Sequence, residues 1–294
     1  DASEDLEGIG KSITIYNESA IPFIAGLHTI VAKDRKKALD KGFKRYFLLN
    51  FNVRKQLMFY ATGISVFGIS RDNIKKIEVG VPHLLEQQKI GQILSIWDKA
   101  IELKEQLIEE KKEQKKGLMQ RLLTGKVRLS GFDEEWKEVK LEEIVEKTKG
   151  KAVANDENGR YPVIGIEYFQ SGIFENFSND NTVMANEKDV LLLWDGANAG
   201  KAFTSISGIV GSTFVKLECK DVNNVYLQKH LELNESFIMS IREGSGIPHV
   251  PKDFLSFYKL NLPPRQEQKA IAKVLSTADK EIELLEEELE QLKL

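Results

Sequence analysis

Two segments of the chain carry apolar residues at alternating spacings of four and three, the pattern of a coiled-coil helix. The pattern is unbroken near the C-terminus and also occurs in the middle of the chain. The predicted helix-pairing residues are Ile271, Leu275, Ala278, Ile282, Leu285 and Leu289 in the C-terminal segment, and Ile90, Leu94, Trp97, Ile101 and Ile108 in the middle segment. A helix from Leu84 to about Leu123 would be roughly 60 Å long, the dimension of a spacer. We expect the two helices to form an antiparallel pair.

These two helices belong to an internal repeat. A shift of 181 positions aligns residues 82–113 with 263–294, and 14 of those 32 positions are identical. Each copy reads as a strand, a proline and a helix. Farther upstream Gly63 matches Gly244 at the same shift, and with gaps Gly10-Lys11 matches Gly200-Lys201. The globular parts are therefore predicted to be duplicated as well.

The repeat sets the expected domain boundaries. Residues 1–82 align only with the later part of the second globular region, so we expect them to be the C-terminal part of a first α/β domain, without its N-terminal part. The long helix would occupy 83–124, a second α/β domain 125–262, and the C-terminal helix 263–294. Within the second domain the pattern predicts helices at 140–147 and 223–241, and strands at 162–166, 188–194 and 209–218. The predicted fold class is α/β (α+β) domains joined by long antiparallel coiled-coil helices, with a two-fold internal repeat.

Composition restricts the function classes. The chain is 41% hydrophobic and 30% charged, as in ordinary globular proteins, and no apolar run is long enough to span a membrane. The first residues show no secretory signal, so a cytoplasmic location is expected. A single cysteine excludes an internal disulfide, and four dispersed histidines make no local metal motif. The net charge of −3 argues against DNA binding by bulk electrostatics unless positive charge is concentrated locally or supplied by a partner.

The stretch from Gly196 to Ala202 resembles a phosphate loop only superficially. A Walker A loop needs four residues between its glycines and Ser or Thr after the lysine, whereas this stretch has three and then alanine. A tight turn is the better interpretation, and such a turn can still touch a DNA phosphate. Asn198 and Lys201 are therefore candidate DNA-binding residues, with Lys11 as the counterpart of Lys201.

Two further loops offer polar groups. The loop Glu243–His249 combines flexible glycines with Ser245 and His249, which can reach base edges or phosphates. Residues 61–67 are its expected counterpart, and the candidates there are Thr62 and Ser65. A plain glycine-rich connection is the alternative for both loops. Lys147, Lys149 and Lys151 around Gly150 make a small basic loop that could meet backbone phosphates, although such charges are often simply solvated.

Charge runs favour helix pairing. Lys104, Lys111 and Lys115 occupy positions of the middle helix where apolar residues are expected, so its distal half should be less tightly paired, or pair elsewhere. The basic run that contains Lys111 and Lys115 and extends to Arg128 could face DNA, yet the acidic run Glu286–Glu288 with Glu290 is its natural complement in an antiparallel pair. Structural pairing is the favoured interpretation.

The sequence lacks the common catalytic signatures. Asn261-Leu-Pro-Pro264 resembles a methyltransferase loop only in composition, because Leu262 interrupts it and no aromatic residue follows. We find no glycine-rich cofactor loop after a strand, no nuclease pattern and no nucleophile elbow. The chain is therefore expected to bind no cofactor and to act as a binding module.

The order of these parts resembles the specificity subunits of type I restriction-modification systems. The similarity lies in the pattern Pro-x-x-x-Glu-Gln-x-x-Ile-x-x-Ile/Val-Leu-Ser-x-x-Asp that opens each helix, and in Leu118-Met-Gln-Arg-Leu-Leu-Thr-Gly-Lys-Val-Arg128. The resemblance implies two target-recognition domains that each read one half of a split double-stranded DNA site, separated by the paired helices. It also implies two modification subunits as partners, which hold S-adenosylmethionine, and restriction subunits as further partners.

Other functions fit parts of the pattern. A coiled-coil adaptor whose globular ends bind proteins would suit the near-neutral charge, and a half-subunit that dimerises is a variant of the DNA-binding interpretation. A nucleotide hydrolase that uses Lys201 ranks third.

Overall fold

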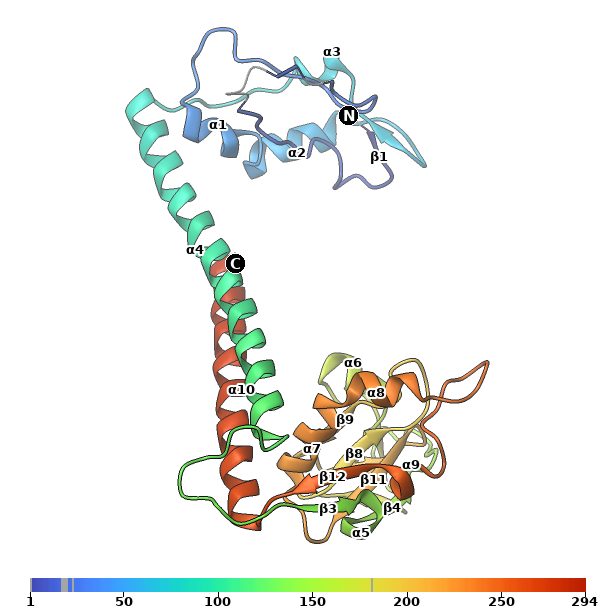
Figure 1. Ribbon diagram of the computed structural model, residues 1–294. Helices are drawn as coiled ribbons and strands as arrows, with labels where there is room; N and C mark the ends of the chain where they lie inside the picture. Colours follow the sequence, from blue (N-terminus) through green and yellow to red (C-terminus); the bar gives the residue numbers. More distant parts are fainter. Residues whose placement is uncertain (1, 17–20, 23, 181) are drawn as a thin grey trace. The chain divides into compact units, whose positions relative to one another are not determined.

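The computed structural model describes residues 2–16, 21–22, 24–180 and 182–294. The chain divides into two compact units (Figure 1). Unit 1 contains residues up to Glu105 together with Leu289–Leu294, and unit 2 contains Gln106–Glu288. None of the described helices is both long and apolar enough to cross a bilayer.

Unit 1 is built mainly from helices. Two short strands, β1 (Ala2–Ser3) and β2 (Phe67–Gly68), pair antiparallel. Its described helices are α1 (Lys41–Phe47), α2 (Phe51–Phe59), α3 (Arg71–Ile74), the first part of α4 (Leu84–Leu122) and the end of α10 (Arg265–Lys293). Asp40, Asn50 and Ser70 cap the three short helices through their side-chain oxygens, as expected for N-cap residues. Its buried cluster is small and consists of Ile9, Val53, Leu57 and Ile69.

Unit 2 is an α/β assembly with two four-stranded sheets. One sheet has the order β4-β11-β8-β9, and the other β6-β5-β10-β7. The first contains β4 (Val145–Lys149), β8 (Val190–Leu193), β9 (Ala202–Thr204) and β11 (Phe214–Cys219). The second contains β5 (Tyr161–Ile164), β6 (Phe177–Ser178), β7 (Met184–Ala185) and β10 (Gly208–Val210).

Helices and one strand pair complete unit 2. The short helices are α5 (Leu141–Ile144), α6 (Ile166–Ser171), α8 (Glu235–Ser240) and α9 (Phe254–Phe257), and the longer ones are α7 (Asn224–Leu233) and α10 (Arg265–Lys293). Strand β3 (Lys137–Lys140) pairs antiparallel with β12 (Lys259–Leu262), which leads into α10.

The sheet β4-β11-β8-β9 separates two hydrophobic cores. On one face Leu192 and Val215 join a large cluster that includes Tyr226, Leu227 and Leu275. On the other face the neighbouring residues Leu191, Leu193 and Phe214 join a second cluster. Strand β8 is therefore buried on both sides, which explains its continuous apolar sequence Val-Leu-Leu-Leu.

The secondary structure differs from the sequence prediction at two places. Residues 140–147 hold only the single turn α5, after which the chain becomes strand β4, because Val145–Lys149 pairs with β11. The predicted strand at 209–218 is two strands, β10 and β11, separated at Gly211. The region 223–241 is helical as predicted, as α7 and α8.

The distal half of α4 pairs with α10 in antiparallel fashion within unit 2. Lys115 lies 2.5 Å from Asp279, Lys111 lies 2.6 Å from Glu281, and Lys112 lies 2.9 Å from Glu286. Ile108, Met119 and Leu122 are buried. Of the expectation that the distal half is less tightly paired, or pairs elsewhere, only the second alternative holds in part: Lys111 and Lys115 have acidic partners on α10, and Lys115 also contacts Glu232 of α7.

The proximal part of α4 is more open. Trp97 and Leu94 are 51% and 37% exposed, and the Trp97 indole donates to the carbonyl of Leu292 at 2.7 Å. Nearer the start of α4, Gly91 approaches α1, where a Cβ atom would lie 2.8 Å from the Phe43 nitrogen.

Near the start of each long helix, a glutamine makes the same two kinds of hydrogen bond. The amide of Gln87 donates to the Pro82 carbonyl, and its oxygen accepts from the Asp40 N–H, the N-cap of α1. The amide of Gln268 donates to the Pro263 carbonyl, and its oxygen accepts from the Asn223 N–H, the N-cap of α7. Both glutamines are 2% exposed. The internal repeat is therefore present in three dimensions.

A second recurring contact lies eleven residues after each glutamine. In unit 1, Asp98 accepts from the Tyr46 hydroxyl of α1 at 2.8 Å. In unit 2, Asp279 lies 2.6 Å from Lys229 of α7. Tyr46 and Lys229 each stand six residues after the N-cap of their helix. Each globular part is thus attached to a long helix at two corresponding points.

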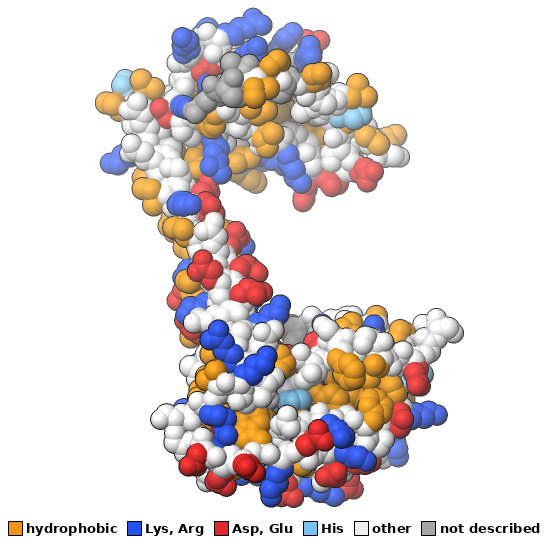
Figure 2. Space-filling model, in the orientation of Figure 1, with side chains coloured by type: hydrophobic (Ala, Val, Ile, Leu, Met, Phe, Trp, Pro, Cys, Tyr) orange, Lys and Arg blue, Asp and Glu red, His pale blue; other side chains and the backbone are white. Residues whose placement is uncertain are grey.

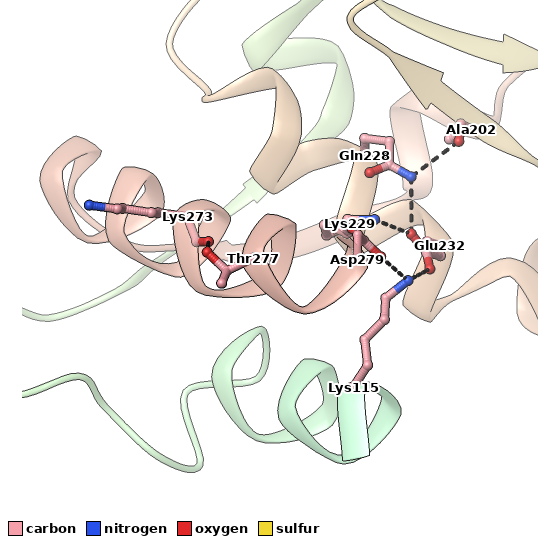
Figure 3. A network of polar contacts seen from close by, with 8 residues as sticks. All are labelled: Lys115, Ala202, Gln228, Lys229, Glu232, Lys273, Thr277 and Asp279. Atoms are coloured by element: carbon pink, nitrogen blue, oxygen red, sulfur yellow. Dashed lines mark hydrogen bonds and ion pairs between the residues drawn. The ribbon is translucent and has the colours of Figure 1, made fainter. Parts of the chain in front are cut away.

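In unit 2 the contact between Asp279 and Lys229 is part of a closed ring of four charged side chains (Figure 3). Lys115 and Lys229 each contact both Glu232 and Asp279, at 2.5–2.8 Å. Burial lowers the pKa of Lys115, but its bonds to Asp279 and Glu232 outweigh burial and hold that pKa above the usual value. The pKa of Glu232 lies below the usual value, because bonds to the two lysines outweigh its burial. The ring joins α4, α7 and α10.

Candidate nucleic-acid interface

The loops around Gly10 and Gly200 share one structural reason for glycine. Gly10 has φ +68° and Gly200 has φ +108°, in the region that favours glycine. A Cβ atom on Gly10 would lie 2.7 Å from a Leu57 methyl group, and one on Gly200 would lie 3.0 Å from a methyl group of Ile238. Leu57 and Ile238 are themselves 181 positions apart. The gapped alignment of these loops is thus consistent with equivalent packing.

The loops that contain Gly63 and Gly244 also correspond. Thr62 and Gly68 form an isolated antiparallel bridge, and Glu243 and His249 form another. Both glycines have positive φ, and a Cβ atom on either would collide with a carbonyl three residues later. The structural counterpart of Glu243–His249 is therefore Thr62–Gly68, one residue later than the predicted 61–67.

Three loops of unit 2 are joined at one place. The Lys149 ammonium at the end of β4 lies 2.5 Å from the Asp195 carboxylate after β8. The Gly196 N–H donates to the Pro248 carbonyl at 2.8 Å, and Asp195 forms a bridge with His249. The structure therefore brings Lys149 and His249 together with the loop that contains Asn198 and Lys201.

Three candidates in this cluster have an acidic neighbour. Lys149 pairs with Asp195, Lys201 lies 4.0 Å from Glu235, and His249 lies 3.7 Å from Glu243. On the face of unit 2 shown in Figure 2, basic and acidic side chains are likewise interspersed. Attraction to phosphates is correspondingly weak, because Asp195 and Glu235 offset the positive charges of Lys149 and Lys201. Binding here would depend more on directional hydrogen bonds than on bulk charge.

The remaining candidates of unit 2 are accessible. Lys151 and Ser245 are exposed, and neither side chain has a hydrogen-bond or ion-pair partner among the described residues. Asn198 is half-buried, and its carbonyl accepts from the Lys201 N–H. The Lys201 ammonium also lies 5.4 Å from the centre of the Phe169 ring, a cation–π contact.

In unit 1 the candidates Lys11, Thr62 and Ser65 are exposed. Thr62 belongs to the bridge with Gly68, and Ser65 lies within that loop. Lys11 follows a turn whose carbonyls at Glu7 and Ile9 accept from the Arg54 guanidinium of α2. No contact between Lys11 and the Thr62–Gly68 loop is recorded among the described residues.

Sequence reasoning missed several residues of the cluster. Asp195, Glu235 and Arg242 were not singled out, although Asp195 pairs with Lys149 and Arg242 donates to the Ala197 carbonyl at 2.7 Å. Trp194 was missed as well: the centre of its ring lies 4.4 Å from the ammonium of Lys147, a residue of the predicted basic loop around Gly150. Burial, and then the nearby charge of Lys149, lowers the pKa of Lys147. The only signal in the sequence was adjacency, since Trp194 and Asp195 directly precede Gly196.

The chemistry of the cluster is that of recognition. It presents ammonium, hydroxyl, amide, imidazole and carboxylate groups, which are the donors and acceptors that read base edges in the major groove. In the part of the chain that the structure describes, no group of three or more His, Cys, Asp or Glu side chains is arranged to hold a metal ion.

Comparisons with known proteins agree on one family. The family model described as "Type I restriction modification DNA specificity domain" matches residues 7–112 and 133–294. The chain is 42% identical over 167 residues to the type I restriction enzyme MjaVIII specificity subunit of Methanocaldococcus jannaschii, covering 54% of this chain and 39% of that protein. It is 29% identical over 160 residues to the EcoDI specificity subunit of Escherichia coli, covering 54% of this chain and 34% of that protein.

A solved structure supports the fold. The type I restriction-modification S subunit from M. genitalium superposes with a TM-score of 0.59 at 18% sequence identity, covering 87% of this chain and 70% of that one. The predicted class of mixed helix and sheet domains with long helices and an internal repeat is confirmed. The matched regions span less than two fifths of the two sequence relatives' own lengths.

Proposed function

Because the chain belongs to the family of type I restriction modification DNA specificity domains, we propose that it reads a split DNA sequence as part of a type I restriction-modification complex. The observation that supports this most directly is the joined loop cluster of unit 2. Three loops place Lys149, His249 and the Gly196–Lys201 turn side by side, with Ser245 and Lys151 accessible. The chain itself carries no catalytic site in this proposal.

Partners supply the chemistry and part of the affinity. Two modification subunits, which hold S-adenosylmethionine, dock on this chain, and restriction subunits can join them. The paired positive and negative charges of the loop cluster predict weak binding to nonspecific DNA by this chain alone. Specific binding is expected once the modification subunits help to enclose the duplex.

The direct test is a gel-shift assay with and without the modification subunits. We expect a specific complex only in their presence, and Lys151→Ala and Ser245→Ala should weaken it. An exposed lysine outside the cluster, Lys280, supplies the control variant Lys280→Ala. A protein adaptor would instead bind its protein partners without any DNA-dependent complex, and that result would contradict the proposal.

Helix length is a second test. In this family interpretation the paired helices set the gap between the half-sites, so adding one helical turn after Glu110 should change the gap and leave both half-sites intact. Mapping of methylated adenine would reveal the changed gap. Changed half-sites with an unchanged gap would refute the role of the helices.

A further inference from the structure

The loop Glu243–His249 of unit 2 holds one large apolar side chain in solvent. Ile247 is 70% exposed and belongs to neither hydrophobic cluster of this unit. An aliphatic side chain in this position contributes to binding only when a partner removes it from water. Single exposed apolar residues are common on protein surfaces, so what matters here is how this residue is held.

Backbone contacts fix the conformation of this loop. The N–H groups of Glu243 and His249 each donate to the carbonyl of the other residue, both at 2.9 Å. The carbonyl of Ile247 lies against Gly244, which has φ +96°, and a Cβ atom on that glycine would lie 2.6 Å from the carbonyl oxygen. Pro248 further restricts the backbone of the residue before it. The Ile247 side chain therefore projects from a fixed backbone.

The loop also carries Ile247 into the joined loop cluster of unit 2. The Pro248 carbonyl accepts from the Gly196 N–H at 2.8 Å, which ties the loop to the turn after β8. A Cβ atom added to Gly196 or to Gly246 would meet no described atom within 4 Å. The space beside this part of the loop is open, so a large ligand can approach the backbone closely.

The other copy of the repeat has a residue of the same shape at this position. Val66 stands 181 positions before Ile247, and both side chains are branched at Cβ. In each loop the carbonyl of this residue is the one that approaches the glycine, Gly63 or Gly244. A β-branched side chain has few rotamers to lose when it is covered. This shape recurs in two loops that otherwise share only the glycine.

The surroundings of Ile247 indicate the chemistry of the partner. Ser245 and His249, two residues to either side, are polar. In the major groove, the C5 methyl group of thymine is an apolar group beside a hydrogen-bond acceptor, O4 of the same base. An aliphatic side chain flanked by a hydroxyl and an imidazole matches such an edge better than it matches a continuous apolar protein surface.

We propose that Ile247 contacts the C5 methyl group of a thymine in the half-site read by unit 2, and that it determines specificity at that base pair. This inference rests on the proposed function, and adds to it the base that one residue selects. Cytosine presents no methyl group at this position, so Ile247 would lose its apolar partner there.

The test uses the complete complex with its modification subunits and its mapped DNA site. Each thymine of the two half-sites is replaced in turn by deoxyuridine, which lacks only the C5 methyl group, and the dissociation constant is measured. With the unaltered chain, one replacement should weaken binding about fourfold, the equivalent of one buried methyl group. Ile247→Ala should bind thymine and deoxyuridine equally at this position.

Two further variants make the result specific. Ile247→Val should retain most of the preference for thymine, because a β-branched side chain remains. Ile173→Ala removes another exposed isoleucine of unit 2, outside the three joined loops, and should retain the preference fully.

Two results would overturn this inference alone. One is a specific complex in which no deoxyuridine replacement weakens binding, and the other is an Ile247→Ala variant that keeps every methyl preference of the unaltered chain. In both cases a specific complex forms, so the proposed function stands. The absence of any specific complex would instead overturn the proposed function and this inference together.

Discussion

The two copies of the repeat share their attachment to the long helices and differ in what surrounds it. In both, a buried glutamine and an aspartate eleven residues later contact a helix of the globular part. In unit 2 the neighbouring carboxylate Glu267 is buried under Arg128 and Trp136, whereas Glu86 in unit 1 is exposed. Among the described residues, unit 1 also has a small buried cluster of four residues, while unit 2 has two larger ones.

This difference separates two kinds of constraint. The glutamine is bound to backbone groups, so its geometry survives divergence of the side chains around it. The chemistry of the candidate recognition loops depends on individual side chains. These side chains differ between the two copies, as in Thr62–Gly68 and Glu243–His249. A duplicated scaffold can thus keep its framework while its recognition loops change.

The sharpest contrast is expected from the two equivalent glutamates. Glu267→Gln should lower the free energy of unfolding of unit 2 by about 3 kcal/mol, because it breaks a buried charge pair and leaves Arg128 unmatched. Glu86→Gln should change unit 1 by less than about 0.5 kcal/mol, as at ordinary surface sites. Native-state hydrogen exchange, followed separately in α10 and α4, measures both. Equal losses of unfolding free energy in the two variants would contradict the difference in burial between Glu267 and Glu86.

The glutamines should behave alike. Gln268→Ala and Gln87→Ala each leave the N–H of a half-buried helix N-cap and a proline carbonyl without a partner, at a cost of about 2 kcal/mol. Exchange should accelerate at the start of α7 in the first variant and of α1 in the second. Gln266→Ala, at an exposed position, is the control. Faster exchange in only one of the two variants would contradict an equivalent role for the two glutamines.

The two long helices could be predicted from the sequence, whereas the loop cluster of unit 2 could be predicted only in part. Helical periodicity and the identities at Pro82/Pro263 and Gln87/Gln268 were sufficient for the long helices, because the periodicity is local in the sequence and the identities recur at one constant shift. The pairing of Lys149 with Asp195 was not predictable, since it joins residues 46 positions apart through the order of strands in the sheet. The partners of Lys111 and Lys115 required the register of the helix pair.

The stability of unit 2 should depend on pH between about 6.5 and 4 through a histidine that unit 1 lacks at the corresponding position. Burial lowers the pKa of His230 in α7 to about 4, whereas Phe47, its counterpart in α1, does not titrate. The unfolded chain protonates this imidazole below pH 6.5 and the folded chain only near pH 4, so stability is lost as the pH falls between these values. The loss should reach about 2 kcal/mol at pH 5. His230→Gln should remove most of this dependence in exchange measurements on unit 2, and persistence of the slope would assign it elsewhere.

The aspartates should show the smallest contrast. Asp279 contacts two lysines, one of them only 9% exposed, whereas Asp98 accepts from Tyr46 and pairs with Arg45 in a more exposed setting. Asp279→Asn should therefore cost about 1 kcal/mol and Asp98→Asn a few tenths. A double-mutant cycle of Asp279→Asn with Lys229→Met should give a coupling near 1 kcal/mol, and a cycle of Asp98→Asn with Tyr46→Phe less than half of that. Because the ring in unit 2 is partly buried, its coupling should fall only slightly in 0.5 M salt. A coupling that disappears in salt, or equal couplings in the two cycles, would mean that the ring contributes no more than an ordinary surface pair.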